Sequence, residues 1–346
     1  MDQATREFIS GKNILVTGGC GSIGGTIVRE LLKLDPKVVR IFSRDEGKHF
    51  DMQQELGPSE TRIRYLIGDI RDRSRLHTAM RDVDLVFHAA ALKHVPLCEY
   101  NPFEAVQTNV IGTQNVIMEA AERGVKRMVA ISTDKAMTPV NTMGASKLLA
   151  EKLVAAASQW NPMTRLACVR FGNVMGSRGS VVPTMIRSIL DKREIFVTDP
   201  AMTRFMMTIQ QAVHLTFKAS AEAHGGEIFI FKMPVLKLGD LVDVIVEDTC
   251  KRADIAVSDV KRHVVGFRPG EKLHEGLFSE EETTRTEERE DMFVVHTLDE
   301  YISVNKRQGW GPVNTDLLLS DKAPLMSHDE IRQMMADAGV WEKIRI

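Results

Sequence analysis

The sequence predicts an α/β fold in which a doubly wound parallel sheet is joined to a smaller C-terminal lobe. Short apolar segments alternate with longer amphipathic segments through the first 172 residues, a pattern typical of a parallel sheet covered by helices on both faces. A glycine-rich turn directly follows the first apolar segment. After Asn173 the alternation gives way to shorter mixed segments, which indicates the second lobe.

Six strands are expected in the first part, each a short apolar run: 13–17, 38–43, 63–67, 84–90, 127–132 and 165–171. Amphipathic helices are expected over 23–34, 102–122 and 142–157. Asn101 is a natural N-cap for the second of these helices. Pro102 suits the first helical position, where its missing N–H loses no hydrogen bond.

The second half of the sequence is expected to return once to the first domain. Residues 203–221 are predicted to form a helix, and residues 227–231 another strand of the same sheet. The expected dinucleotide-binding domain is therefore 1–172 together with 203–233. Residues 173–202 and 234–346 are assigned to a substrate-binding lobe.

Composition and charge exclude several classes of protein. A formal net charge of -2 gives no electrostatic footprint for a nucleic acid. No apolar run approaches the ~20 residues of a membrane span, and the first residues are polar, so we expect a cytoplasmic protein without a membrane span. The four cysteines are scattered without zinc-like spacing, so they are interpreted as free thiols and no metal site is expected.

A cofactor site is predicted where the first strand runs into its glycines. Glycines at this point let backbone N–H groups approach a pyrophosphate at a helix N-terminus, as in Rossmann dinucleotide-binding domains. The residues expected to contact the cofactor here are Thr17, Gly18, Gly21, Ser22, Ile23 and Gly24.

Residues at the ends of the next strands favour NADP over NAD. Ser43 and Arg44 end the second strand, and an arginine here accommodates a 2′-phosphate, whereas an acidic residue binds the ribose hydroxyls of NAD. The alternative is that Arg44 is a solvated surface residue. Further cofactor contacts are expected from Asp45, Asp69, Ile70, Ala89, Ala90 and Ala91.

The fifth strand ends in Thr133, Asp134 and Lys135, and Met143 and Lys147 lie at the start of the next helix. Short-chain dehydrogenases carry a serine or threonine and a YxxxK motif in this position. Met143 occupies the place of the tyrosine, and a thioether cannot transfer a proton. An Asp-Lys dipeptide alone can equally be a surface ion pair.

The motifs TGGCGSIG, SRDE, HAAALKHVP, STDKA and MGASK, in this order, closely resemble those of UDP-N-acetylglucosamine 4,6-dehydratases. These enzymes belong to the extended short-chain dehydrogenase/reductase superfamily and act in bacterial polysaccharide synthesis. The resemblance covers about residues 10 to 295 and continues through FGNV, RGSVVP, TRF and RPGE. Some of these enzymes carry methionine in the tyrosine position.

The resemblance implies oxidation at C4 of the sugar, elimination of water across C5 and C6, and return of hydride to C6. Lys135 would be the base at C5, Asp134 the acid at C6, and Thr133 would bond the C4 oxygen. Lys147 would hold the nicotinamide ribose. The group that takes the C4 hydroxyl proton is left open between Asp134 and Lys147 acting through water.

The resemblance also implies a UDP-sugar site. Arg268 would hold the diphosphate and Glu271 the uridine ribose, while Lys93 could reach substrate or cofactor. The remaining expected substrate contacts are Asn173, Val174, Val181, Pro183, Thr198 and Arg204. Relatives pair through helices of the first domain, so a homo-oligomer, dimer or hexamer, is expected through helices 102–122 and 142–157.

Two other functions remain open from the sequence. One is a sugar-nucleotide 4-epimerase or dehydrogenase of the same superfamily, although these normally use the missing tyrosine. The other is a non-catalytic NADP-binding regulator, in which Met143 would mark lost activity. Retention of Asp134, Lys135 and Lys147 argues against the regulator.

Overall fold

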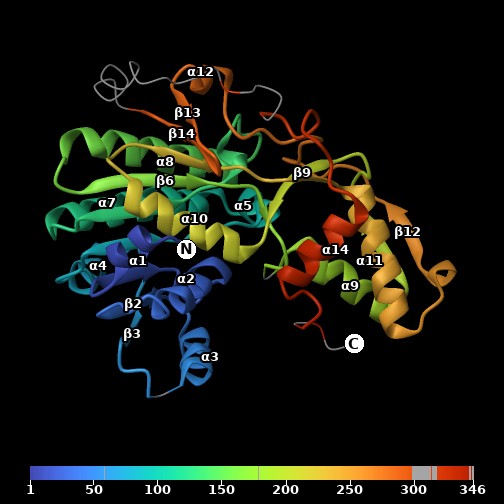
Figure 1. The fold of residues 1–346 in the computed structure, drawn as a ribbon, viewed down its shortest axis with the longest axis horizontal. Coiled ribbons are helices and arrows are strands. Elements are labelled where there is room, and N and C mark those ends of the chain that lie inside the picture. The colour runs from blue at the N-terminus through green and yellow to red at the C-terminus, as the bar shows by residue number, and fades with distance from the viewer. Residues whose placement is uncertain (58, 178, 298–312, 314–317, 343, 345–346) are drawn as a thin grey trace. The chain divides into compact units, whose positions relative to one another are not determined.

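The computed structural model describes residues 1–57, 59–177, 179–297, 313, 318–342 and 344 (Figure 1). The chain divides into two compact units. The first comprises Met1–Arg170, Val213–Phe231 and Glu280–Val313, and the second comprises Phe171–Ala212, Lys232–Ser279 and Asn314–Ile346. Among the described residues, no helix is long and apolar enough to cross a membrane.

The first unit is built on a sheet of nine strands within the described residues, in the order β3-β2-β1-β4-β5-β6-β10-β14-β13. The first seven of these are parallel: β1 Asn13–Thr17, β2 Val38–Ser43, β3 Ile63–Ile67, β4 Leu85–His88, β5 Arg127–Ile131, β6 Arg165–Arg170 and β10 Ile228–Phe231. This confirms the predicted doubly wound α/β fold. The strand expected over 84–90 ends at His88, so Ala89 leaves the sheet two residues early.

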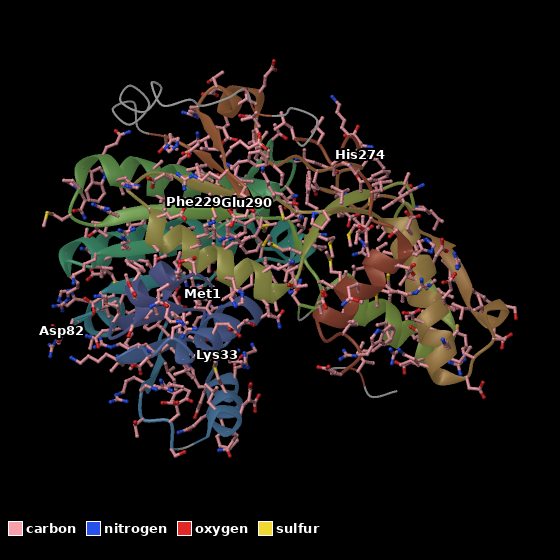
Figure 2. All side chains as sticks on the ribbon, viewed as in Figure 1. Met1, Lys33, Asp82, Phe229, His274 and Glu290 are labelled. Atoms are coloured by element: carbon pink, nitrogen blue, oxygen red, sulfur yellow. The ribbon has the colours of Figure 1, made fainter. Side chains whose placement is uncertain are left out.

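Helices cover both faces of this sheet (Figure 1). The ring of Phe87 on β4 meets Phe217 of α10, with centroids 5.2 Å apart, while the next residue, His88, hydrogen-bonds Thr113 of α7 on the opposite face. Figure 2 labels Phe229 on β10, whose side chain is fully buried in this core. The helices of the first unit are α1 Gln3–Ile9, α2 Ser22–Leu32, α3 Glu46–Leu56, α4 Arg73–Ala79, α5 Val95–Tyr100, α6 Pro102–Ala105, α7 Gly112–Glu122, α8 Thr142–Trp160, α12 Glu280–Thr283 and most of α10 Ile209–Glu222.

The helix predicted over 102–122 is interrupted by a π-helical turn, η1 Val106–Ile111. Asn109 in this turn accepts a hydrogen bond from Leu92 N (2.8 Å) and donates to Leu92 O (3.0 Å) and to Ser146 Oγ (2.9 Å). The turn thus ties the loop after β4 to α8. Asn101 lies at the cap position, but its amide donates to Leu97 O and does not cap α6.

Two segments differ from the sequence prediction. Residues 203–207 form strand β9, not the first turns of a helix, because they pair with β7 and β11, and α10 begins only at Ile209. Residues 234–346 do not all belong to the second unit. Strands β13 Thr286–Glu288 and β14 Met292–Val295 add an antiparallel edge to the large sheet, next to β10.

The second unit has its own core. Strands β7 Asn173–Val174, β9 Thr203–Met207 and β11 Val235–Lys237 form one small sheet, and β8 Glu194–Val197 pairs in parallel with β12 Lys261–Val264. Buried side chains of α9 Val181–Lys192, α11 Leu238–Ala253 and α14 His328–Asp337 pack together around Met185, Ile189, Val244 and Ile331. A 3₁₀ turn, η3 Val257–Asp259, leads into β12.

Candidate functional site

The glycine loop after β1 has the geometry that a dinucleotide requires. Gly18 has a φ of +67°, and a Cβ there would lie 2.7 Å from Ala90 N, so only glycine fits beside the end of β4. A Cβ on Gly24 would overlap the Gly18 carbonyl oxygen, which explains the close packing of α2 on the loop. Gly21 caps α2 with extended backbone, so the free N–H groups of the helix start lie beside the loop.

A cavity of about 270 Å³ lies at the carboxyl ends of β1, β2, β3 and β4. Ten of the predicted cofactor residues line it: Gly18, Gly21, Ser43, Arg44, Asp45, Asp69, Ile70, Ala89, Ala90 and Ala91. Predicted residues Thr17, Ser22, Ile23 and Gly24 are outside this lining, and Thr17 is fully buried against His88. The cavity therefore fits a dinucleotide in position and in chemistry.

Five lining residues were missed by sequence reasoning: Cys20, Phe42, Lys48, Gly68 and Thr108. Lys48 could have been found from the sequence, because it lies one turn into the helix that follows Ser43 and Arg44. Thr108 could not have been found, because it comes from the π-helical turn of a segment predicted as regular helix. Its buried Oγ1 has no hydrogen-bond partner among the described residues, so a polar ligand in the cavity could satisfy it.

The cavity rim carries charges of both signs, Arg44 and Lys48 beside Asp69 and Asp45. The Asp45 carboxylate caps α3, accepting from Lys48 N at 3.0 Å, and also pairs with Lys48 Nζ at 2.5 Å. Arg44 lies 3.4 Å from the Asp69 carboxylate. Partial burial opposes ionisation of Asp69, but hydrogen bonds from Arg71 hold its pKa below the ordinary value. Two cations, Arg44 and Lys48, thus face the cavity with their own counter-charges nearby.

The fifth strand delivers the predicted catalytic residues together. Thr133 caps a 3₁₀ turn, η2 Asp134–Ala136, and its Oγ1 donates to Asp134 Oδ1 at 2.9 Å. Lys135 Nζ donates to the same oxygen at 3.0 Å. Asp134 is fully buried, and its Oδ2 has no hydrogen-bond partner among the described residues. A carboxylate in this state is not the solvated surface ion pair that the dipeptide alone could be.

Lys147 is buried behind this pair. Its Nζ donates to Ile131 O at 2.8 Å, and burial lowers its pKa to about 8. Helix α8 brings it there because Asn141 caps the helix by accepting from Gly144 N at 2.7 Å. A Cβ on Gly144 would overlap Lys135 O, so the start of α8 packs directly on the turn that bears Lys135.

Met143 lies in a small apolar cluster. Its side chain is buried with Cys98 and Ala105, and Leu92 and Val95 pack against them. A thioether cannot transfer a proton, so Met143 offers no acid–base group here. Lys93, predicted to reach substrate or cofactor, is exposed on the loop after β4.

Except for Lys93, the predicted substrate residues lie in the second unit, where Thr198 and Arg204 contact the loop that bears Arg268 and Glu271. Gly266 N donates to Thr198 O at 3.0 Å, and Arg204 donates to the carbonyls of Lys272 (2.8 Å) and Leu273 (3.0 Å). Arg204 on β9 therefore ties this strand to the backbone of Lys272 and Leu273, at the end of the loop. Four further predicted substrate residues lie elsewhere in this unit. Asn173 and Val174 are half-buried in β7, and in α9 Val181 is exposed and Pro183 is half-buried.

Between these two anchors, Arg268 and Glu271 form a reciprocal turn. Glu271 N donates to Arg268 O, and Arg268 N donates to the Glu271 carboxylate, both at 3.1 Å. The Arg268 side chain is exposed. The turn leaves its guanidinium at the surface of the loop, where it can contact an anionic group.

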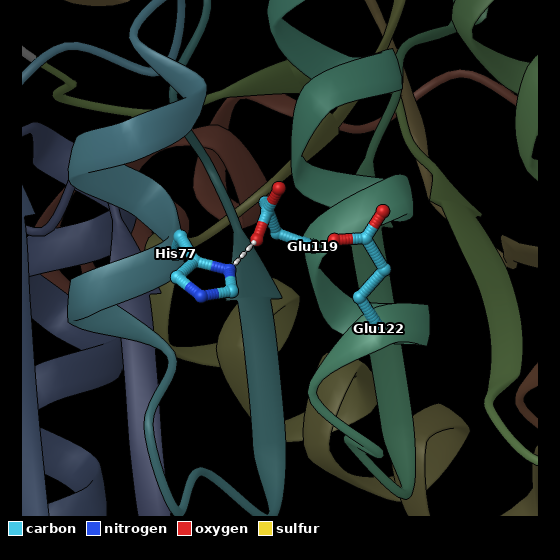
Figure 3. Close-up of side chains that lie close together, drawn as sticks. All are labelled: His77, Glu119 and Glu122. Atoms are coloured by element: carbon cyan, nitrogen blue, oxygen red, sulfur yellow. Dashed lines mark hydrogen bonds and ion pairs between the residues drawn. The ribbon is translucent and has the colours of Figure 1, made fainter.

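One group of side chains has the composition of a metal site, but an arginine already binds its carboxylates. Figure 3 shows His77 of α4 beside Glu119 and Glu122 of α7, with His77 Nδ1 2.7 Å from Glu119. Arg73 donates to Glu119 at 2.6 Å and also pairs with Glu122. This arrangement holds α4 against α7. A second group, Asp240, Asp243 and His328, lies in the other unit, where Asp243 pairs with Arg262.

The sheet, the glycine turn and the cavity at the strand ends define a dinucleotide-binding protein of the Rossmann class. More specifically, the chain belongs to the family described as polysaccharide biosynthesis protein, which it matches over residues 14–297.

Known proteins similar to this chain support the resemblance drawn from its motifs. An uncharacterized membrane protein of Methanocaldococcus jannaschii is 50% identical over 86% of this chain and 89% of its own. A UDP-N-acetylglucosamine 4,6-dehydratase (inverting) of Campylobacter jejuni is 44% identical over 83% and 84%. A UDP-glucose 4-epimerase of Rickettsia bellii is 42% identical over 80% of each chain.

The fold is also that of a solved structure. The X-ray structure of Pen from Bacillus thuringiensis superposes with a TM-score of 0.87 at 44% identity, covering 95% of this chain and 98% of that one. The resemblance to 4,6-dehydratases inferred from the motifs is thereby confirmed at the level of sequence.

Proposed function

We propose that this chain is a sugar-nucleotide 4,6-dehydratase that removes water from UDP-N-acetylglucosamine, for the synthesis of a surface polysaccharide or glycan. The observation that supports this most strongly is the Asp134–Lys135 pair, with Asp134 fully buried and Lys135 half-buried, which provides an acid and a base in a site where Met143 replaces the phenol. The dehydratase relative of Campylobacter jejuni supports the same reaction class.

The pair can supply both proton transfers of an elimination. Transfer of one proton along the Lys135 Nζ–Asp134 Oδ1 hydrogen bond converts the ion pair into an amine and a carboxylic acid. The Lys135 amine then takes the C5 proton while Asp134 gives its proton to the C6 oxygen, which leaves as water. The ammonium of Lys135 later returns a proton to C5. The proton that the C4 hydroxyl loses on oxidation passes to the Lys135 amine, so the pair ends in its initial state.

Other groups orient the reactants. Thr133, whose hydroxyl lies beside Asp134, is assigned to the C4 oxygen, and Lys147 to the nicotinamide ribose. A bound nicotinamide cofactor supplies the hydride acceptor at C4 and the hydride donor at C6. In the second unit, the exposed Arg268 is assigned to the diphosphate and Glu271 to the uridine ribose. Lys93, Asn173, Val174, Val181, Pro183 and Thr198 are assigned to the remaining substrate contacts.

Incubation with UDP-N-acetylglucosamine and cofactor tests the reaction class directly. We expect a product lighter by one water, detected by mass spectrometry, with a carbonyl at C4 and a methyl group at C6 by NMR. The relative named UDP-glucose 4-epimerase favours a second candidate, 4-epimerisation, which would give an isomer of unchanged mass. Unchanged substrate at millimolar concentration would contradict both and favour a non-catalytic protein.

We propose NADP as the cofactor, on the strength of the two cations at the cavity rim. Replacing Arg44 and Lys48 together by alanine should weaken NADP⁺ binding about 100-fold, because each charge-assisted contact with a 2′-phosphate is worth about one factor of ten. NAD⁺ binding should change less than threefold. Isothermal titration with both nucleotides measures the effect, and Lys37→Ala, an exposed lysine at the start of β2, is the matched control. Equal losses for both nucleotides would contradict NADP preference.

We also propose a homo-oligomer formed through the first unit. Elements α5, α6, η1 and α8 pack against one another and expose large apolar side chains that the fold itself does not cover. These are Leu97, Tyr100, Phe103, Ile111 and Leu149, of which Tyr100 and Phe103 are 86% and 85% exposed. Apolar exposure on this scale is typical of a protein–protein interface.

A further inference from the structure

A small cavity lies beside Lys147, separate from the cofactor cavity. It measures about 10 Å³ and is lined by side chains of β4, α7, β5, α8 and β6. Its polar lining residues, His88, Thr113, Ser132, Lys147 and Glu151, are all more than nine-tenths buried. Charges that face each other here interact without screening by bulk water.

Glu151 is the carboxylate that faces this cavity. It follows Lys147 by four residues on α8, which places both on the same face of the helix. Arg170 on β6 fixes its orientation with two hydrogen bonds, Nε to Oε1 at 3.0 Å and Nη2 to Oε2 at 2.7 Å. The opposite side of the guanidinium binds Glu282, with both contacts at 3.0 Å. Glu282 does not line the cavity.

The other titratable groups around Lys147 are uncharged or paired elsewhere. Thr113 Oγ1 donates to Asn109 O, so His88 must donate to Thr113 through Nε2, and burial lowers the pKa of His88 to about 3. Burial likewise raises the pKa of Cys168, which therefore stays a thiol.

The remaining neighbours of α8 lie on the elements packed against its first turn. On η2, Asp134 and Lys135 pair with each other, and on α5 Glu99 accepts from Thr142 N at 2.5 Å. Glu119 and Glu122 of α7 bind Arg73. Within the described part of the chain, Glu151 is thus the charged group positioned to act on Lys147 across the cavity.

We propose that Glu151 is a positioning residue that holds Lys147 protonated at neutral pH, acting as its buried counter-charge. Arg170 keeps the carboxylate in place, and Glu282 balances the remaining charge of Arg170. The role of Lys147 toward the nicotinamide ribose rests on the proposed function; its charge state does not. Without Glu151, burial alone would leave an amine that donates fewer hydrogen bonds to a ribose.

The titration of Lys147 itself tests this inference. In full-length protein labelled with ¹⁵Nζ-lysine, and assigned by loss of the signal in Lys147→Arg, the midpoint of the wild type should lie near pH 8. In Glu151→Gln it should fall by about one pH unit, the scale of a nearby buried charge that an arginine partly offsets. The same shift should appear in the alkaline limb of the pH dependence of NADP⁺ binding.

Glu282→Gln is the matched control, because it makes the same change on the same arginine but away from the cavity. It should move the Lys147 midpoint by less than about 0.3 unit. An unmoved midpoint in Glu151→Gln, or equal shifts in both variants, would overturn the proposal. If Glu151→Gln does not fold, Glu151→Asp replaces it, with a smaller downward shift expected and no shift counting against the proposal. A shifted midpoint in a protein that releases no water from UDP-N-acetylglucosamine would refute the proposed function alone.

Discussion

Replacing Lys135 by alanine is expected to lower the rate of water elimination by about 10³-fold, the usual contribution of a positioned base. Its Nζ is the amine of the buried pair, and no other described side chain bonds Asp134 Oδ1 except Thr133. The cofactor cavity lies on the glycine loop and does not include Lys135, so the dissociation constant for NADP⁺ should change less than threefold. Product formation is measured by mass spectrometry under saturating substrate.

Lys126→Ala is the control for this variant, because Lys126 is an exposed lysine at the other end of the same strand and pairs only at the surface with Asp84. It should retain wild-type turnover. In D₂O the wild-type product should carry deuterium at C5, the position that Lys135 reprotonates. Near-normal turnover by Lys135→Ala would remove the Asp-Lys pair from the mechanism, even if the product proves to be that of a dehydratase.

The strands were predictable because each is buried on both faces and therefore reads as a short apolar run. Five of the six expected strands keep their expected start and end within one residue. β4 stops early because Ala89 and Ala90 must approach the backbone of Gly18, a contact between residues far apart in the sequence that no local pattern encodes. The edge strand β13 was missed for the same reason, because its charged segment becomes a strand only by pairing with β14. Strand β14 is a short apolar run that was overlooked.

The candidate site was predictable where its residues follow strands directly. Asp134 and Lys135 could be located because they follow β5, but the burial of Asp134 could not, because it depends on how α8 packs on this turn at Gly144. The sequence shows that Met143 lacks a phenol. Only the packing shows that its side chain joins Cys98 and Ala105.

Arg170 gives the second large expected effect, this time on stability. It was invisible in the sequence because its partner Glu282 lies 112 residues away. Its side chain is 1% exposed, and although burial alone would lower its pKa, Glu151 and Glu282 raise it above the ordinary value. Arg170→Met should therefore lower the free energy of unfolding by about 3–5 kcal/mol, because it leaves two buried carboxylates without a cation. Urea unfolding at pH 7, followed by circular dichroism, measures the change.

The triple variant Arg170→Met, Glu151→Gln, Glu282→Gln separates the lost charge pairing from lost packing. It also removes the two carboxylates that Arg170→Met leaves without a cation. It should therefore recover at least half of the lost free energy of unfolding, because replacing a buried ion network as a whole costs little. Recovery would show that the triad contributes little net stability. Its retention would then have to be explained by what Glu151 does to Lys147. A triple variant as unstable as Arg170→Met would instead make the triad a packing element that joins β6, α8 and α12.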